Sequence, residues 1–431
     1  MENKLIITKE WEEAIKLSLQ DKKSLYITGR PGTGKSELLK YIRKNTNKNL
    51  AVVAPTGIAA VNVQGVTMHS FFRLGFKPYH RDDDYIIMMN KDHKRMIREL
   101  DIIIIDEVSM VRADMIDNIN FVLQTVRHSN KYFGGVKMIF IGDLYQLPPV
   151  ITDDVVKFYE EHYNSPYFFD AHVFTESNFK YNRIELTEVF RQTDIEFKRV
   201  LDNFRTNNYT QNDLDIINKR VVNRMPINRE LVLLSSTNRI ADQVNKERLA
   251  RINSPEGFYP TEFEKDKYGN MPTGYKEFKD LYLKVGAQVM MTVNDPDKNW
   301  INGTVGVITQ LNDNDMLVKI DDENYKIVRY EWKNIKYEFN SKNGKLKEVE
   351  NGSIIQFPLK LSWAVTIHKA QGKTLDNAII DMGNGAFATG QTYVALSRVK
   401  SMDGIFLRKP ITEKDIMIDS TIVEFENSFD N

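Results

Sequence analysis

A glycine-rich stretch near the amino terminus limits what this chain can fold into more than any other feature. An apolar run, 25–27, precedes it, and the helix-favouring run 37–42 follows it. Its spacing is that of a P-loop, in which backbone N–H groups close around a phosphate without Cβ clashes. The helix that leaves such a loop points its positive end at the phosphates. The sequence therefore predicts a nucleotide site at Gly29-Arg30-Pro31-Gly32-Thr33-Gly34-Lys35-Ser36.

The polar side chains of this loop have predictable tasks. Lys35 can reach the β- and γ-phosphates of a nucleotide, and the Ser36 hydroxyl can bind Mg²⁺. An ordinary glycine-rich turn is the alternative, which the complete spacing disfavours. The loop residues predicted to bind the nucleotide are Gly29, Pro31, Gly32, Thr33, Gly34, Lys35 and Ser36.

Composition bounds the partners of the chain. Its 431 residues include 59 Lys and Arg against 59 Asp and Glu, so any nucleic-acid binding must come from a local basic groove. The lack of cysteine excludes disulfides, thiol catalysis and Cys-ligated zinc. The first residues resemble neither a signal peptide nor an organelle presequence, and no apolar run reaches membrane-spanning length. We expect a cytoplasmic protein without a membrane partner.

Apolar, strand-like runs alternate with helical segments in the first third of the chain. The clearest lie within 49–57, 101–107 and 137–143, and each ends in polar residues. Together with the strand before the P-loop, they predict a doubly wound α/β sheet of parallel strands. Ligands of such sheets lie at the carboxyl ends of the strands, so we expect the chemistry along that edge.

Two of these strand ends carry candidate catalytic groups. Asp106 and Glu107 follow four isoleucines; in a nucleotide hydrolase the first carboxylate holds Mg²⁺ and the second polarises the attacking water. The alternative is a solvated acidic pair. Gln146 follows the next strand, where a neutral amide can sense the γ-phosphate by hydrogen bonding. A glutamine that only caps a turn is the alternative there.

The order of the motifs carries a family resemblance. The P-loop is followed by five further motifs that resemble those of superfamily-one DNA helicases, and the segment 112–150 resembles the signature that separates the PIF family from its RecD-like relatives. The chain is identified as a member of the PIF family, in a minimal bacterial nucleoid-associated or phage-encoded form. The five motifs are 106–110, 142–150, 186–192, 364–372 and 393–398.

The resemblance implies an α/β architecture of two RecA-like (P-loop NTPase) domains with parallel sheets and two inserts. One insert is a small wedge subdomain, and the other, rich in turns and alternating runs, is a small β-barrel of the Src-homology-three type. The expected limits are 1–68 and 101–180 for the first RecA-like domain, 69–100 for the wedge, 181–252 and 354–431 for the second RecA-like domain, and 253–353 for the barrel.

The resemblance also assigns residues beyond the P-loop. Arg191 and Arg398 resemble arginine fingers supplied by the second domain, and Gln371 and Gly372 join the nucleotide site. In the wedge, the stretch 70–81 interleaves aromatics with cations, as suits base stacking and phosphate binding. The alternative is that these aromatic side chains form the small hydrophobic core of the wedge. The residues expected to face DNA are Thr56, His69, Phe72, Thr366, His368 and Lys369.

The implied activity is that of a DNA-dependent ATPase that uses ATP and Mg²⁺ to move 5′ to 3′ on single-stranded DNA and to unwind duplexes. Its expected partners are single-stranded DNA and duplex or G-quadruplex junctions, bound as a monomer or with self-association on the DNA. One departure concerns Trp11, which stands where the family carries an adenine-reading glutamine. Two alternatives stay open: a RecD-like translocase within a larger complex, and an ATP-gated single-stranded DNA-binding protein that does not unwind.

Overall fold

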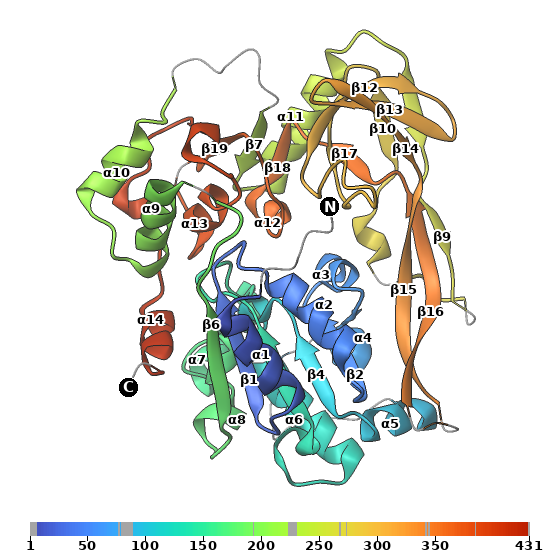
Figure 1. The fold of residues 1–431 in the computed structure, drawn as a ribbon, viewed down its shortest axis with the longest axis vertical. Coiled ribbons are helices and arrows are strands. Elements are labelled where there is room, and N and C mark those ends of the chain that lie inside the picture. Colours follow the sequence, from blue (N-terminus) through green and yellow to red (C-terminus); the bar gives the residue numbers. More distant parts are fainter. Residues whose placement is uncertain are drawn as a thin grey trace.

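The computed structural model describes residues 7–75, 78, 89–192, 194–222, 231–266, 269–272, 274–340, 343, 345–383 and 385–429. Two parallel sheets lie one above the other, and an antiparallel insert stands beside them (Figure 1). In the described part of the chain, no helix is both long and apolar enough to cross a membrane. The predicted α/β class with two parallel sheets is confirmed.

The first domain is a parallel sheet with helices on both faces. Its strands are β1 (Ser24–Gly29), β2 (Leu50–Ala54), β3 (Val66–Thr67), β4 (Ile102–Ile105), β5 (Lys137–Ile141) and β6 (Tyr181–Leu186). Its helices are α1 (Lys9–Leu19), α2 (Lys35–Asn45), α3 (Gly57–Asn62), α4 (Met68–Phe72), α5 (Lys91–Arg98), α6 (Ala113–Arg127), α7 (Asp153–His162) and α8 (His172–Thr175). The strand order is β3-β2-β4-β5-β1-β6, which places the P-loop strand β1 beside β5.

The isoleucine run of β4 explains why this strand is central. Successive side chains of a strand point to opposite faces, so Ile102 and Ile104 pack with α1 and α2, whereas Ile103 and Ile105 pack with α6. Both faces are therefore covered, as a central parallel strand requires. The polar residues that follow β4 emerge at the carboxyl edge of the sheet, where β1 also ends.

Two elements correct the predicted limits of the second domain. β6 pairs in parallel with β1 from Ser24↔Tyr181 onward, so 181–186 belongs to the first sheet. The last helix, α14 (Ser420–Asn427), also returns to the first domain, because Glu426 accepts a hydrogen bond from the buried Tyr26 hydroxyl at 2.8 Å. The assignment of both segments to the second domain is therefore wrong.

The second domain holds a smaller parallel sheet. Its strands are β7 (Val232–Ser235), β18 (Ala364–Thr366), β19 (Ala378–Asp381) and β20 (Ile405–Leu407), in the order β18-β7-β19-β20. Its helices are α9 (Ile195–Thr206), α10 (Gln211–Asn218), α11 (Asn238–Ala250), α12 (Ile367–Ala370) and α13 (Gln391–Leu396). The motif 364–372 thus forms a strand and a short helix at the edge of this sheet.

The larger insert is antiparallel, as its alternating runs predict. Its strands are β8 (Glu256–Tyr259), β9 (Glu262–Glu264), β10 (Leu281–Lys284), β11 (Gln288–Met291), β12 (Val305–Leu311), β13 (Asp315–Ile320), β14 (Glu323–Val328), β15 (Tyr330–Asn340), β16 (Lys345–Gln356) and β17 (Leu359–Leu361). Because β17 pairs with β11, the insert extends beyond its predicted limit at 353. Its assignment to the Src-homology-three type stays a prediction.

A long hairpin of this insert returns to the first domain. β15 and β16 run down one side of the molecule towards α5 (Figure 1). There the Tyr337 hydroxyl accepts a hydrogen bond from the Val52 N–H at 3.0 Å, and Arg43 pairs with Glu348 at 2.6 Å. Of the predicted wedge, α4 and α5 lie in this region, whereas 76–77 and 79–88 lie outside the described residues.

Candidate nucleotide and DNA site

The P-loop joins β1 to α2 at the carboxyl edge of the first sheet. Gly32 and Gly34 both have φ +85°, a backbone region that residues with a Cβ rarely adopt. A Cβ on Gly32 would lie 2.5 Å from the Cβ of Arg191, and one on Gly34 would lie 2.8 Å from the ring of Trp11. The glycines are therefore required by close neighbours as well as by the turn.

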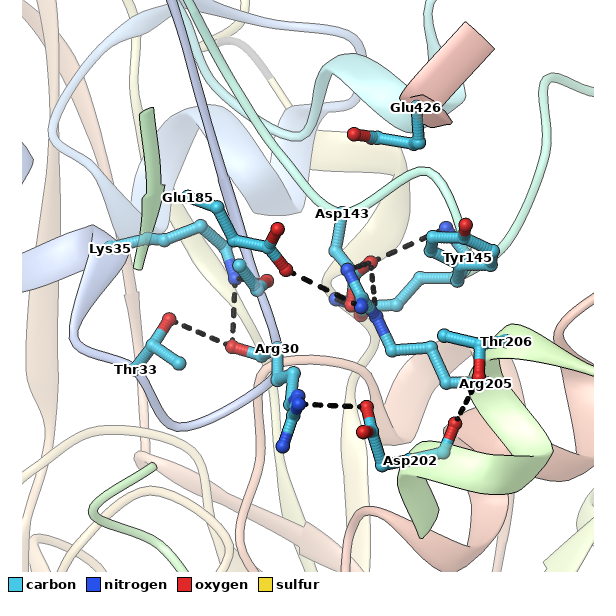
Figure 2. Close-up of polar contacts among 12 residues, drawn as sticks. Arg30, Thr33, Lys35, Asp143, Tyr145, Glu185, Asp202, Arg205, Thr206 and Glu426 are labelled. Atoms are coloured by element: carbon cyan, nitrogen blue, oxygen red, sulfur yellow. Dashed lines mark hydrogen bonds and ion pairs between the residues drawn. The ribbon is translucent and has the colours of Figure 1, made fainter. Parts of the chain in front are cut away.

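Lys35 begins α2 with its ammonium group inside the loop. It donates to the carbonyl oxygens of Gly29 and Arg30, the latter at 3.0 Å (Figure 2). Loss of solvent lowers the pKa of Lys35, while the nearby carboxylates of Asp143 and Glu107 act in the opposite direction. The lysine is thus held in place by the loop, and the acidic groups around it favour its charged form.

The pair Asp106 and Glu107 lies at the end of β4. Burial, followed by the charge of Glu107, raises the pKa of Asp106 to about 7, and burial raises the pKa of Glu107. The two carboxyl groups are crowded, so each disfavours ionisation of the other. A hard divalent cation would offset this repulsion and favour their ionised forms. The Asp106 carboxylate and the Ser36 hydroxyl in the first turn of α2 are oxygen donors of the kind that Mg²⁺ prefers. Glu107 itself has φ 51° and ψ 46°, a strained backbone of the kind found at functional sites.

A line of side-chain amides connects Glu107 to the second domain. Gln371, which follows α12, donates from Nε2 to Glu107 Oε2 at 3.1 Å and to Gln146 Oε1 at 3.2 Å. The Nε2 of Gln146 then donates to Asp143 Oδ2 at 3.2 Å. Residues from both domains are therefore in direct contact around the carboxylate predicted to activate water.

Arg205 of α9 completes this network, and the sequence did not indicate it. Its guanidinium lies 3.3 Å from Asp143 Oδ1 and 3.6 Å from Glu185, and it stacks over the ring of Tyr145 (Figure 2). A buried arginine on an amphipathic helix has no local signature, because its partners lie far away in the chain. Asp143 could have been found, since it ends a core strand inside the motif 142–150.

A second ion pair ties α9 to the P-loop itself. Arg30 and Asp202 are 2.9 Å apart, so this pair joins the P-loop to α9 of the second domain (Figure 2). Both side chains are partly exposed, and such a pair contributes about 0–1 kcal/mol. The pair therefore affects the position of the P-loop relative to α9 more than it affects the stability of the fold.

The two predicted arginine fingers lie close together beside the P-loop. Arg191 donates to the Ser397 carbonyl at 3.3 Å, and Arg398 donates to the Val394 carbonyl at 2.9 Å. Loss of solvent lowers the pKa of Arg191 to about 9 and that of Arg398 to about 10. Arg191 does not come from the body of the second domain as predicted, because it directly follows β6 of the first sheet.

Trp11 packs against the P-loop. Its indole Nε1 donates to the Thr33 carbonyl at 3.4 Å, and its ring lies against Gly34. The side chain is buried and belongs to the core formed by α1 and α2. The tryptophan is therefore part of the packing of the loop, whereas an adenine-reading amide would have to face the base.

Five of the six residues expected to face DNA fall into three groups. Thr56 and Thr366 use their hydroxyls to cap α3 and α12, so they position neighbouring residues. His69 and His368 are half-buried, and burial lowers the pKa of each, so both favour the neutral imidazole. Lys369 is exposed.

The prediction that Phe72 faces DNA is wrong. Its side chain is 0% exposed and packs edge-on against Phe71 in the main core, so it cannot stack on a base in this arrangement. The alternative of a core aromatic holds for this residue. Gly372 has open space around it, with φ +76°. For the remaining site residues, roles in ATP or DNA binding stay predictions.

Known proteins resemble the chain over nearly its whole length. A family model described as PIF1-like helicase matches residues 4–216. The ATP-dependent DNA helicase Pif1 of Campylobacter jejuni is 28% identical over 436 residues, which cover 93% of this chain and 94% of that protein. The Pif1 of Bdellovibrio bacteriovorus is 28% identical over 420 residues, covering 96% and 90%.

Solved structures agree with this. The crystal structure of Bacteroides sp Pif1 in complex with ADP-AlF4 has 34% identity and a TM-score of 0.91, with 99% of this chain and 97% of that chain covered. Bacteroides Pif1 bound to ssDNA has the same identity and coverage, with a TM-score of 0.71. The chain therefore belongs to the PIF1-like helicase family, and the prediction of a DNA helicase is confirmed.

Proposed function

We propose that this helicase moves 5′ to 3′ along single-stranded DNA and unwinds the duplex ahead of it, driven by hydrolysis of ATP with Mg²⁺ at the cleft between its two RecA-like domains. The polarity rests on the family resemblance. The relatives solved with ADP-AlF4, with ssDNA and at forked dsDNA support the choice of ligands. Binding to G-quadruplex junctions and self-association on DNA stay predictions.

One observation carries the proposal: Gln371 of the second domain donates to both Glu107 and Gln146 of the first. Any change in the bonding of Glu107 or Gln146 during hydrolysis therefore reaches α12 directly. The same short segment holds His368 and Lys369, which are expected to face DNA. Linkage between domain closure and the reaction is a common way in which such enzymes turn hydrolysis into motion.

Each residue has one task in the cleft. Lys35 and the P-loop amides bind the phosphates, Glu107 accepts a proton from the attacking water, and Arg191 and Arg398 offset charge that develops during transfer. Ser36 and Asp106 would hold Mg²⁺, which supplies further neutralisation of that charge when bound. Gln146 contributes hydrogen bonds to the network without adding charge.

Strand displacement on partial duplexes with either a 5′ or a 3′ tail tests the proposal. We expect unwinding only from the 5′ tail, and ATP hydrolysis that single-stranded DNA stimulates. Lys35→Ala should abolish both activities, because the variant lacks the cation that contacts the phosphates. Unwinding only from a 3′ tail would contradict the polarity. Stimulated hydrolysis without displacement would instead indicate an ATP-gated DNA-binding protein.

A further inference from the structure

Three lysines gather where the β-insert contacts the second domain; we name Lys360, Lys369 and Lys373 the lysine seam. Lys360 lies on β17, opposite Met290 of β11, whereas Lys369 lies on α12 and Lys373 just beyond it. Both β17 and α12 lie in the upper half of Figure 1. The seam therefore brings together a lysine of the insert and two lysines of the second domain.

The contact between these units is tight. Lys373 Nζ donates to the side-chain oxygen of Asn302, which lies in the loop between β11 and β12, at 2.6 Å. A Cβ on Gly303 would lie 2.5 Å from the Thr374 carbonyl, so the backbones of the two units touch at this point. The position of Lys373 relative to the insert is thus defined by two contacts.

The seam has positive charge without an acidic neighbour. Loss of solvent, then the charges of Lys373 and Lys369, lower the pKa of Lys360 to about 7. Loss of solvent alone lowers the pKa of Lys373 to about 8. No carboxylate acts against either effect, and within the described residues none of the three lysines forms an ion pair.

Four other lysines of the same insert each lie within 2.6–3.4 Å of a carboxylate. These paired lysines are Lys319, Lys326, Lys333 and Lys336. Half-buried, unpaired cations destabilise a fold unless a ligand brings the opposite charge.

We propose that the lysine seam binds a backbone phosphate of the single-stranded DNA, with Lys360 and Lys373 as binding residues beside Lys369. Three ammonium groups from two units suit a phosphodiester, which offers several oxygens and tolerates contacts from different directions. Asn302 positions Lys373 by accepting its hydrogen bond. The proposal rests on the proposed function in one respect, namely that the substrate is single-stranded DNA.

Stability and affinity separate this role from a purely structural one. If the seam serves DNA, Lys360→Met removes an unfavourable charge from the free protein and a favourable interaction from the complex. The variant should then unfold at an equal or higher temperature while it binds DNA more weakly. A lysine that only packs the interface between the two units would lose stability on substitution. The two roles therefore predict opposite shifts in melting temperature.

The experiment measures binding of a labelled oligothymidylate by fluorescence anisotropy across a salt series, using the full chain. We expect Lys360→Met and Lys373→Met each to weaken binding several-fold near 0.1 M salt. The slope of log K against log salt should become shallower by about 0.7 for each phosphate interaction that a substitution removes, the value for single strands. Lys326→Met is the matched control, since this lysine of the same insert already pairs with Asp315. The KM for ATP in the absence of DNA should not change.

Wild-type hydrolysis, with and without the oligonucleotide, tests the proposed function separately from the seam. If the wild type binds the oligonucleotide and the two variants bind with its affinity and salt slope, the seam proposal is overturned. A lower melting temperature with an unchanged slope would also overturn it, because the lysines would then be structural. A weaker complex with a shallower slope and no loss of stability supports it.

Discussion

The nucleotide cleft and the lysine seam differ in how their charges are balanced. In the cleft, acidic groups act on Lys35, and Arg205 lies within 3.6 Å of two carboxylates. In the seam, no carboxylate acts on Lys360. The charges of the cleft are therefore balanced within the protein, whereas no carboxylate of the protein balances Lys360.

Arg191 belongs with the seam in this respect, although it lies in the cleft. Desolvation lowers the pKa of its guanidinium and the charge of Arg398 lowers it further, whereas the carboxylates of Glu107 and Asp143 act on Arg398 in the opposite direction. Arg191 in the cleft and Lys360 at the interface between the insert and the second domain thus both lack a balancing carboxylate, and we expect both to meet a phosphate group.

The largest effect is expected for Arg191→Ala. If this guanidinium meets the charge that develops on the transferred phosphate, its removal should lower kcat by about 10³–10⁵-fold. DNA-stimulated hydrolysis at saturating ATP measures the change. Arg408→Ala is the control, because that arginine is half-exposed and pairs with Asp381 at the end of β19. A loss of less than tenfold would remove Arg191 from the catalytic set.

Glu107→Gln should have the next largest effect. The amide cannot accept a proton, so hydrolysis should fall by about 10²–10⁴-fold. Its oxygen can still accept the hydrogen bond from Gln371, so ATP binding should persist. Single-turnover hydrolysis and binding of a fluorescent ATP analogue separate the two outcomes. Glu37→Gln, an exposed change on α2, serves as the control. Substantial turnover by Glu107→Gln would contradict its assignment as the base.

Arg205→Met tests whether the cleft is balanced in advance. Removing one partner of a buried ion pair leaves Asp143 charged and unpaired, at a cost of about 3–5 kcal/mol in unfolding free energy. Adding Asp143→Asn should restore part of that loss, because the uncompensated charge disappears. Denaturant unfolding of both single variants and the double variant measures the coupling. Additive losses would mean that the two side chains do not depend on each other.

The sequence alone predicts the parts of the site that local spacing determines. The P-loop needs a turn of fixed length between a strand and a helix, and the carboxylate pair needs only the end of a buried strand. Both lie where the sheet geometry requires them. The two parallel sheets follow for the same reason, because runs buried on both faces have a clear pattern.

The rest depends on contacts between distant segments. β6 and α14 have ordinary amphipathic patterns, and only pairing with β1 and the buried Tyr26–Glu426 bond assign them to the first domain. Arg205 is predicted by nothing near it in the chain. Phe72 lies in a stretch that suits DNA binding by composition, yet α4 turns its ring into the core. Composition cannot decide the direction in which a side chain points.

The smallest effect concerns Lys360 and pH, and it sharpens the comparison in the absence of any ligand. In the folded protein the pKa of Lys360 is about 7, whereas the unfolded chain keeps a lysine near about 10.4. Between these values the unfolded state binds more protons, so stability rises with pH. The energetic penalty of burying the charged Lys360 is complete below pH 7 and is relieved as the pH approaches 10.

Lys360→Met should therefore exceed the wild type in melting temperature most at pH 7, and this difference in melting temperature should narrow at pH 8 and 9. Lys373 titrates in the same direction, with a pKa of about 8, and its charge lowers the pKa of Lys360, so its deprotonation narrows the gap further as the pH rises. A gap that widens with pH would mean that Lys360 is stabilised by an acidic group, and the seam would then resemble the cleft.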